Sequence, residues 1–187
     1  IKKLRAMTGA GLADVKKALT EADGDFDKAK DLLRERGLAI AAKRSDRETS
    51  NGCVLVKSVD GFAAMVAVKC ETDFVAAGKD FVELVQSILD SAIAAKAKTI
   101  EEVKTLKLAN GDEAEAAVQH RSGISGEKME IDGYNFLEGD NIAVYDHMGK
   151  HTLATMVQLS ANNDEAGHKV AMQVAAMNPQ YISRNDI

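Results

Sequence analysis

Two apolar runs separated by a single Asp-Gly pair constrain the fold of this 187-residue chain more than any other feature. The runs cover residues 53–59 and 62–70, and Asp60-Gly61 lies between them. Such a connection is the strongest short-range signal for a β-hairpin with a type I′ turn, because both turn residues need a positive φ. We therefore predict a hairpin, and the almost unbroken apolar run of its second strand indicates that this strand is buried.

A helical pattern follows the hairpin after a short junction. Residues 78–96 carry apolar side chains at the spacing of one helix face. These side chains are Phe81, Leu84, Val85, Ile88, Leu89, Ala92 and Ile93. We expect this helix to pack on the hairpin, which places residues 70–76 at a strand-to-helix junction on a rigid support.

The junction places an acid and an aromatic side by side, Asp73 and Phe74. The carboxylate beside the ring disfavours burial of the pair within its own chain, since an unpaired charge is costly to bury. Aromatic side chains often carry a large share of the energy of a protein interface. The pattern therefore indicates that another protein receives Phe74.

The succession of strand, turn, strand and helix recurs later in the chain. Residues 142–145 and 153–159 flank a turn around Gly149, and Asn178-Pro179 ends the helix that follows. The repetition predicts an internal duplication with two adjoining antiparallel sheets, and hence an α+β fold. A two-stranded sheet under one helix is marginal alone, so we expect this second half to be incomplete.

The segment between the two units predicts smaller elements. Thr99 and Glu102 have the spacing of a capping box, and another helix is expected to begin at Asp112. Both pieces are acidic and rich in alanine, so we expect them to be peripheral. Residues 129–136, which contain Asp132-Gly133, predict a further strand or hairpin.

Three short helical patterns divided by glycine-containing loops precede the first hairpin. They predict a compact bundle of the ubiquitin-associated (UBA-like) type over residues 1–38, with Gly37 ending the third helix. Residues 39–51 are polar and lack apolar periodicity, which favours a linker. The remaining chain divides into residues 52–138, with the junction motif, and residues 139–187.

The composition narrows the class of protein. A net charge of −5, from 29 acidic and 24 basic residues, argues against direct nucleic-acid binding. No apolar run approaches the roughly 20 residues that cross a bilayer, so we expect no membrane contact and a cytoplasmic protein. Cys53 and Cys70 are expected to be small buried side chains of a reducing compartment. Self-association stays open.

Catalytic and metal-binding interpretations are weak. Cys70 has no base at a spacing that the sequence can establish. His147 and His151 could face each other across a short turn, but a metal site needs a third ligand, and alternation points Asp146 away. Gly9 and Gly11 lack the lysine and the preceding strand of a phosphate loop. We expect neither an enzyme nor a bound cofactor or metal.

Two stretches together carry a family resemblance. Residues 4–12, with Lys16-Lys17-Ala18-Leu19 after them, resemble the amino-terminal signature of the elongation factor Ts family. Residues 68–76 resemble the second signature of that family, and the order and spacing of the two also fit. The resemblance implies a guanine-nucleotide exchange factor that binds elongation factor Tu and promotes GDP release by disturbing the Mg²⁺ and phosphate site of that GTPase.

The resemblance also assigns residues to this role. It implies a wedge at the Mg²⁺ side of the partner, formed by Thr72, Asp73, Phe74 and Val75, with Phe74 as the apolar anchor. It further implies that Leu12, Ala13 and Lys16 of the bundle grip the nucleotide-binding domain of the partner, and that His147 at the second hairpin touches another domain.

The chain departs from the family pattern at a few positions. The family commonly has an acidic residue at position 67, asparagine at 69 and a basic residue at 77, where Ala67, Lys69 and Ala77 stand here. Longer members continue into a coiled-coil insertion and a returning segment. The alternative hypothesis is an interaction module whose UBA-like bundle binds a ubiquitin-like or nascent-chain partner.

Overall fold

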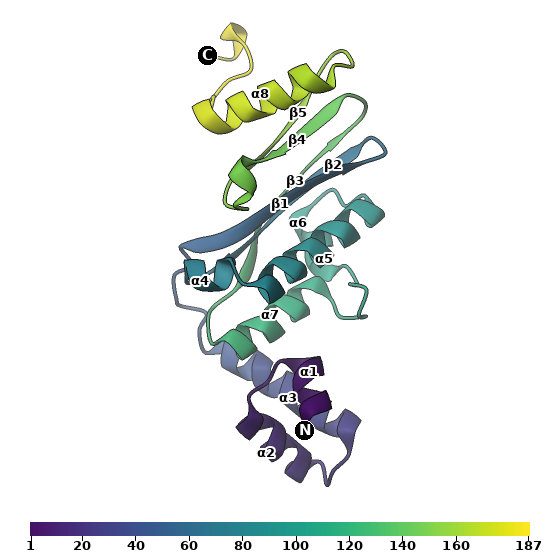
Figure 1. Cartoon of the computed structure of the whole chain (residues 1–187), viewed down its shortest axis with the longest axis vertical. Helices are drawn as coiled ribbons and strands as arrows, with labels where there is room; N and C mark the ends of the chain where they lie inside the picture. The colour runs from purple at the N-terminus through teal and green to yellow at the C-terminus, as the bar shows by residue number, and fades with distance from the viewer.

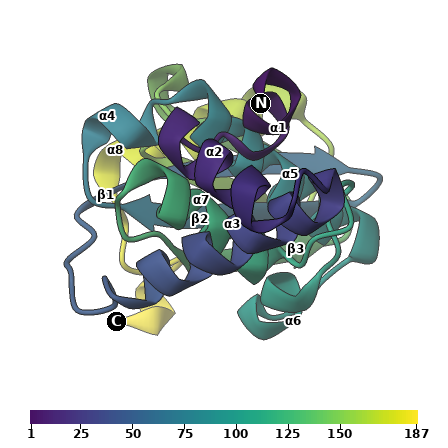
Figure 2. The same ribbon diagram turned by 90° about the horizontal axis from the view of Figure 1, so that it is seen from below.

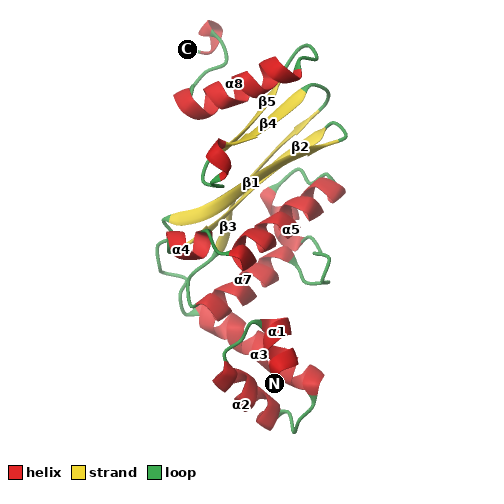
Figure 3. Cartoon of the chain, in the orientation of Figure 1, coloured by secondary structure: helices red, strands yellow, loops and turns green.

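The computed structural model describes all 187 residues as an elongated molecule with three parts in a row (Figure 1). The helical bundle lies at one end, a three-stranded sheet with its helices in the middle, and a two-stranded sheet with one helix at the other end. Runs of helices and runs of antiparallel strands follow one another along the chain, which confirms the predicted α+β class (Figure 3). No helix is both long and apolar enough to cross a membrane.

The bundle consists of α1 (Lys2–Thr8), α2 (Leu12–Glu21) and α3 (Phe26–Ala42). Its small core contains Leu4, Val15, Ala18, Ala22, Ala29 and Leu33. Ile1 and Met7 share the helical spacing of Leu4 but are half exposed. Thr8 is buried instead, and its hydroxyl donates to the carbonyl oxygen of Leu4 at 2.7 Å.

The third helix does not end at Gly37, as the sequence had predicted, but continues to Ala42 and so crosses the predicted boundary at residue 38. Gly37 lies buried inside the helix. It faces Gly123 of α7 (Ala114–Ser125), so closely that a side chain on Gly123 would overlap the Gly37 backbone. Gly37 therefore allows a close crossing of α3 and α7 and does not end the helix. In Figure 2, α3 lies in front of α7.

The predicted hairpin is confirmed as β1 (Asn51–Val59) and β2 (Phe62–Cys70). Val59 pairs with Phe62 across the turn. Asp60 and Gly61 have φ values of 48° and 74°, as a type I′ turn requires. Most of β2 is buried.

Strand β3 (Glu130–Glu138) pairs with β2 and completes a sheet of order β1-β2-β3. The segment around Gly133 is therefore a strand with a register shift opposite Ala67 and Val68, and not a separate hairpin. Helices α5 (Lys79–Ala95), α6 (Ile100–Thr105) and α7 contribute to the main core together with this sheet.

The expectation that the middle helices are peripheral is wrong. Val103 of α6 and Val118 of α7 are fully buried, and α7 joins the core to α3. Helix α7 begins at Ala114, two residues after the predicted Asp112. Its many small side chains suit close packing between helices and sheet, which the composition alone did not reveal.

The second unit contains β4 (Ile142–Asp146), a short 3₁₀ turn η1 (His147–Gly149), β5 (Ala154–Gln158) and α8 (Asp164–Met177). A second 3₁₀ turn, η2 (Arg184–Asp186), follows near the chain end. Asn163 caps α8 by accepting from the amide of Ala166 at 2.9 Å. The amide of Val54 in β1 donates to the carbonyl oxygen of His151 at 2.8 Å, so the two sheets adjoin as predicted.

The division of the chain into domains after residues 38, 51 and 138 stays a prediction.

Candidate functional site

The junction motif forms the short helix α4 (Asp73–Ala76) between β2 and α5. The hydroxyl of Thr72 caps this helix by accepting from the amide of Val75 at 3.3 Å. Val75 packs on the main core, whereas 86% of Phe74 is exposed. Two adjacent residues of this single helical turn thus provide an inward anchor, Val75, and an outward aromatic ring, Phe74.

A carboxylate from a distant part of the chain holds the start of this motif. Glu127 accepts from the amides of Glu71 and Thr72, both at 3.1 Å, and from the Thr72 hydroxyl at 2.6 Å. Charge-assisted hydrogen bonds of this kind are stronger than neutral ones. The segment that leads into α4 is therefore fixed by three bonds to one side chain.

Glu71 fixes the same segment in a second way. Its carboxylate accepts from the Lys128 amide at 2.6 Å and from Arg47 at 3.2 Å. These bonds hold the pKa of Glu71 below its ordinary value, and the bond from the Lys128 amide has the largest effect. The carbonyl oxygen of Glu71 accepts from the Asn51 side chain at 2.9 Å.

The two cysteines are buried, as the sequence had predicted. Burial, followed by the charge of Glu127, raises the pKa of Cys70 to about 11. Its Sγ donates to the carbonyl oxygen of Thr72 at 3.2 Å. Burial also raises the pKa of Cys53 to about 12. Both thiols are protonated near neutral pH, which does not favour nucleophilic chemistry.

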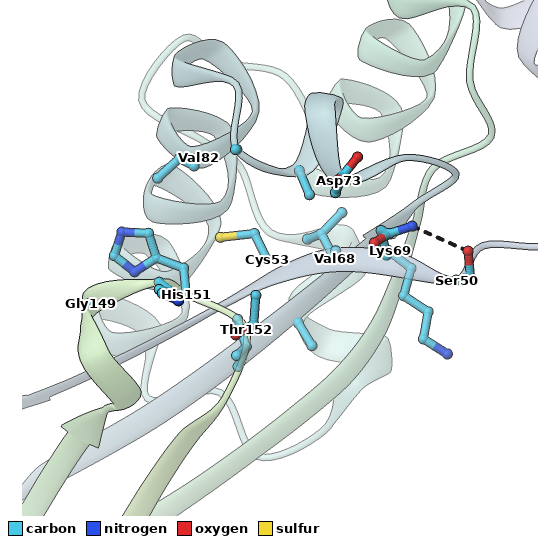
Figure 4. A pocket seen from close by; sticks show the side chains of 16 residues that line it. Ser50, Cys53, Val68, Lys69, Asp73, Val82, Gly149, His151 and Thr152 are labelled. Carbon is cyan, nitrogen blue, oxygen red and sulfur yellow. Dashed lines mark hydrogen bonds between the residues drawn. The ribbon is translucent and has the colours of Figure 1, made fainter.

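A groove of about 800 Å³ lies between α4, β1 and the turn after β4. Asp73 contributes from α4, Lys69 from β2, and His151 from the β4–β5 connection (Figure 4). The fold thus places the first-repeat motif and the second hairpin turn on opposite sides of one groove. The sequence did not predict this proximity.

The two histidines of the turn have separate partners. His147 lies 3.1 Å from the Tyr145 hydroxyl through its Nδ1, and it does not line the groove. Nδ1 of His151 lies 2.5 Å from the Asp146 carboxylate, so the expectation that Asp146 points away is wrong. Strand alternation fails here because Met148 and His151 adopt positive φ. No group of three His, Cys, Asp or Glu side chains is arranged to hold a metal ion.

The predicted bundle residues are accessible. Leu12 is 46% exposed, and Ala13 and Lys16 are exposed on the same helix, α2. In Figure 1, α4 lies at the left edge of the middle part, and α2 lies in the bundle at the lower end of the molecule. The predicted contact regions therefore belong to different parts of the elongated chain.

Sequence reasoning missed Glu127 and Glu71 as supports of the motif. Glu127 follows Gly126, which ends α7 with a φ of 84°. That glycine signals a helix end and a change of chain direction. No local sequence pattern predicts the contact between Glu127 and Thr72, which lie 55 residues apart in the chain.

Comparison with known proteins places this α+β chain, with its N-terminal bundle and exposed Asp-Phe pair, in the class of translation elongation factors. The family model described as Elongation factor TS matches residues 71–187. The chain belongs to the elongation factor Ts family.

Curated relatives support this membership over the whole chain. Elongation factor Ts of Bacteroides fragilis is 57% identical over 188 residues, which cover 100% of this chain and 57% of the relative. The protein from Phocaeicola vulgatus is 56% identical and covers 97% of this chain and 55% of its own length. That from Azobacteroides pseudotrichonymphae is 46% identical over 100% of this chain and 68% of its own length. The chain thus spans little more than half the length of the first two.

Proposed function

We propose that this chain binds elongation factor Tu and promotes the release of GDP from it, without making or breaking a covalent bond. The observation that carries the proposal is the exposure of Phe74, which is 86% exposed. The helix that carries it is capped by Thr72 and packs on the core through Val75. A large apolar ring held in water loses exposed surface when a partner pocket receives it. Family membership supports the choice of partner.

The mechanism is a linkage between two ligands of the GTPase. If the chain weakens the binding of GDP to its partner, GDP must weaken the binding of the chain by the same factor. GTPases hold the nucleotide through a phosphate loop and a Mg²⁺ ion that demands near-ideal octahedral geometry. A small displacement beside that ion is therefore costly, and a wedge placed there is efficient.

The roles proposed within the wedge rest on the family resemblance, and the exposure of Asp73 and Phe74 supports them. Phe74 enters an apolar pocket of the partner, and Asp73, exposed beside it, disturbs polar and metal-linked contacts there. Thr72 and Val75 hold the helix, one as its cap and one through the core. Leu12, Ala13 and Lys16 provide a second contact, and the turn with His147 a third.

The test is the release of labelled GDP from elongation factor Tu in the presence of a substoichiometric amount of this chain. We expect release to accelerate and to turn over more than once per chain. Release at the spontaneous rate, with the chain folded, would contradict the proposal. The comparisons give no support to the alternative of a bundle that binds a ubiquitin-like or nascent-chain partner.

A further inference from the structure

We propose that Glu127 is a positioning residue for the wedge: it sets the direction in which Phe74 leaves the chain and joins the wedge to the helix on which the bundle is docked. This inference rests on the proposed exchange function. Glu127 does not belong to the motif, and it lies 53 residues after Phe74 in the sequence (127 minus 74).

The geometry carries the first step. Helix α4 has only four residues, and a helix of one turn has no stability of its own in water. Its orientation must therefore come from the contact of Val75 with the core and from the segments that flank the helix. On the N-terminal flank, Glu127 is the acceptor for two successive amides, those of Glu71 and Thr72.

The Thr72 hydroxyl transmits this constraint into the helix. It donates to one carboxylate oxygen of Glu127 at 2.6 Å and accepts from the Val75 amide at 3.3 Å. Glu127 thereby fixes the hydroxyl in the direction that caps α4. Loss of the carboxylate leaves two amides without an acceptor and leaves the capping hydroxyl free to rotate.

Glu127 is itself fixed to the end of α7. Its carbonyl oxygen accepts from the Ser122 hydroxyl at 2.5 Å, and its amide donates to Ser125 at 3.1 Å. The same helix carries Gly123, which lies against Gly37 of the bundle helix α3. The end of α7 therefore contacts the bundle through Gly123 and holds Glu127, which binds the base of the wedge.

This arrangement has a consequence for exchange. The bundle and Phe74 are held at a set separation and direction, so that binding of one places the other on the partner. Pre-organisation of this kind lowers the conformational cost of reaching the productive complex. Loss of this pre-organisation lowers the maximal rate of GDP release. It has a smaller effect on the concentration of chain that gives half of the maximal rate.

The experiment compares Glu127→Ala, Glu127→Gln and the control Glu113→Ala in catalysed GDP release. Glu113 lies at the other end of α7 and pairs with Lys107 on the surface. We expect Glu127→Ala to lower the maximal rate about tenfold, the equivalent of one charged hydrogen bond. Glu127→Gln should retain part of the rate, since its amide oxygen still accepts, and Glu113→Ala should match the parent. A Glu127→Ala rate equal to that of the parent would overturn the inference.

A double-mutant cycle with Phe74→Ala tests whether Glu127 acts through the ring. We expect Glu127→Ala to have no further effect once Phe74 is removed. Fully additive effects would show that Glu127 does not position Phe74, and would overturn the inference alone. If Phe74→Ala itself released GDP as fast as the parent, the proposed function would fail first.

Amide hydrogen exchange separates positioning from general loss of structure. In Glu127→Ala, the amides of Glu71 and Thr72 should lose protection while those of the β1–β2 ladder keep theirs. If the ladder amides lost protection as well, Glu127→Gln would be measured in its place. Unchanged protection of both amides in the folded variant would contradict the inference.

Discussion

Gly37 of α3 and Gly123 of α7 lie in direct backbone contact, and no side chain larger than hydrogen fits on Gly123 without overlap with Gly37. The contact is asymmetric. A Cβ on Gly37 would meet the His120 ring at 3.4 Å, an ordinary van der Waals distance. The bundle is therefore attached to the body of the protein through a close crossing of two helices, at which one position is strictly limited in size.

The asymmetry predicts opposite effects for two similar substitutions. Gly123→Ala should destabilise the protein by about 1–3 kcal/mol, because overpacking against backbone outweighs the gain in helix propensity. Gly37→Ala, the matched control in the same crossing, should be neutral or slightly stabilising, since it gains up to about 1 kcal/mol of propensity. Thermal unfolding measures both. Equal changes in stability for Gly123→Ala and Gly37→Ala would contradict the close crossing of α3 and α7.

Leu12 should matter for binding and not for stability. It is 46% exposed on α2, so Leu12→Ala should leave the melting temperature unchanged and weaken binding to elongation factor Tu by about tenfold. Val170→Ala is the control and should bind like the parent, since Val170 is a similarly exposed aliphatic side chain on α8. Isothermal titration measures the two affinities. An unchanged affinity of Leu12→Ala would contradict the proposed contact between the bundle and elongation factor Tu.

The carboxyl of Glu71 should make stability depend on pH. Its folded-state pKa lies below the ordinary value of 4.5. Its contribution to stability is therefore complete above that value and is lost as the pH falls through the lowered folded-state pKa. We expect Glu71→Gln to be less stable than the parent at neutral pH, and the difference to shrink in acid. Urea unfolding across this range measures it.

An NMR titration tests the cause of the lowered pKa. Arg47→Ala should bring the pKa of Glu71 only part of the way back to its ordinary value. The hydrogen bond from the Lys128 amide, which lowers this pKa most, remains in the variant. A difference in stability between Glu71→Gln and the parent that stayed constant into acid would contradict the assignment.

The sequence predicted elements whose signals are local. The β1–β2 hairpin follows from the positive φ that Asp60 and Gly61 allow, and the register that pairs Val59 with Phe62 follows from the two-residue turn. The apolar face of α5, centred on Phe81 and Val85, was equally clear. Exposure of Phe74 could be predicted because it follows the charged Asp73 at a strand-to-helix junction on the surface.

The features that the sequence did not predict depend on contacts between distant segments. Gly37 looks like a helix end until the approach of α7 gives it another purpose. Likewise, Glu127 resembles any surface acid until the fold brings it to Thr72. The pairing of Asp146 with His151 depends on two residues with positive φ in the turn, where strand alternation no longer applies.

The central claim is that Phe74 is the wedge that accelerates GDP release, and one measurement tests it most directly. Release of labelled GDP from elongation factor Tu is compared for the parent chain, Phe74→Ala and Met177→Ala, a control that removes another exposed apolar side chain. We expect Phe74→Ala to slow catalysed release by at least about tenfold with an unchanged melting temperature, and Met177→Ala to match the parent. Release by Phe74→Ala at the rate of the parent would contradict the account.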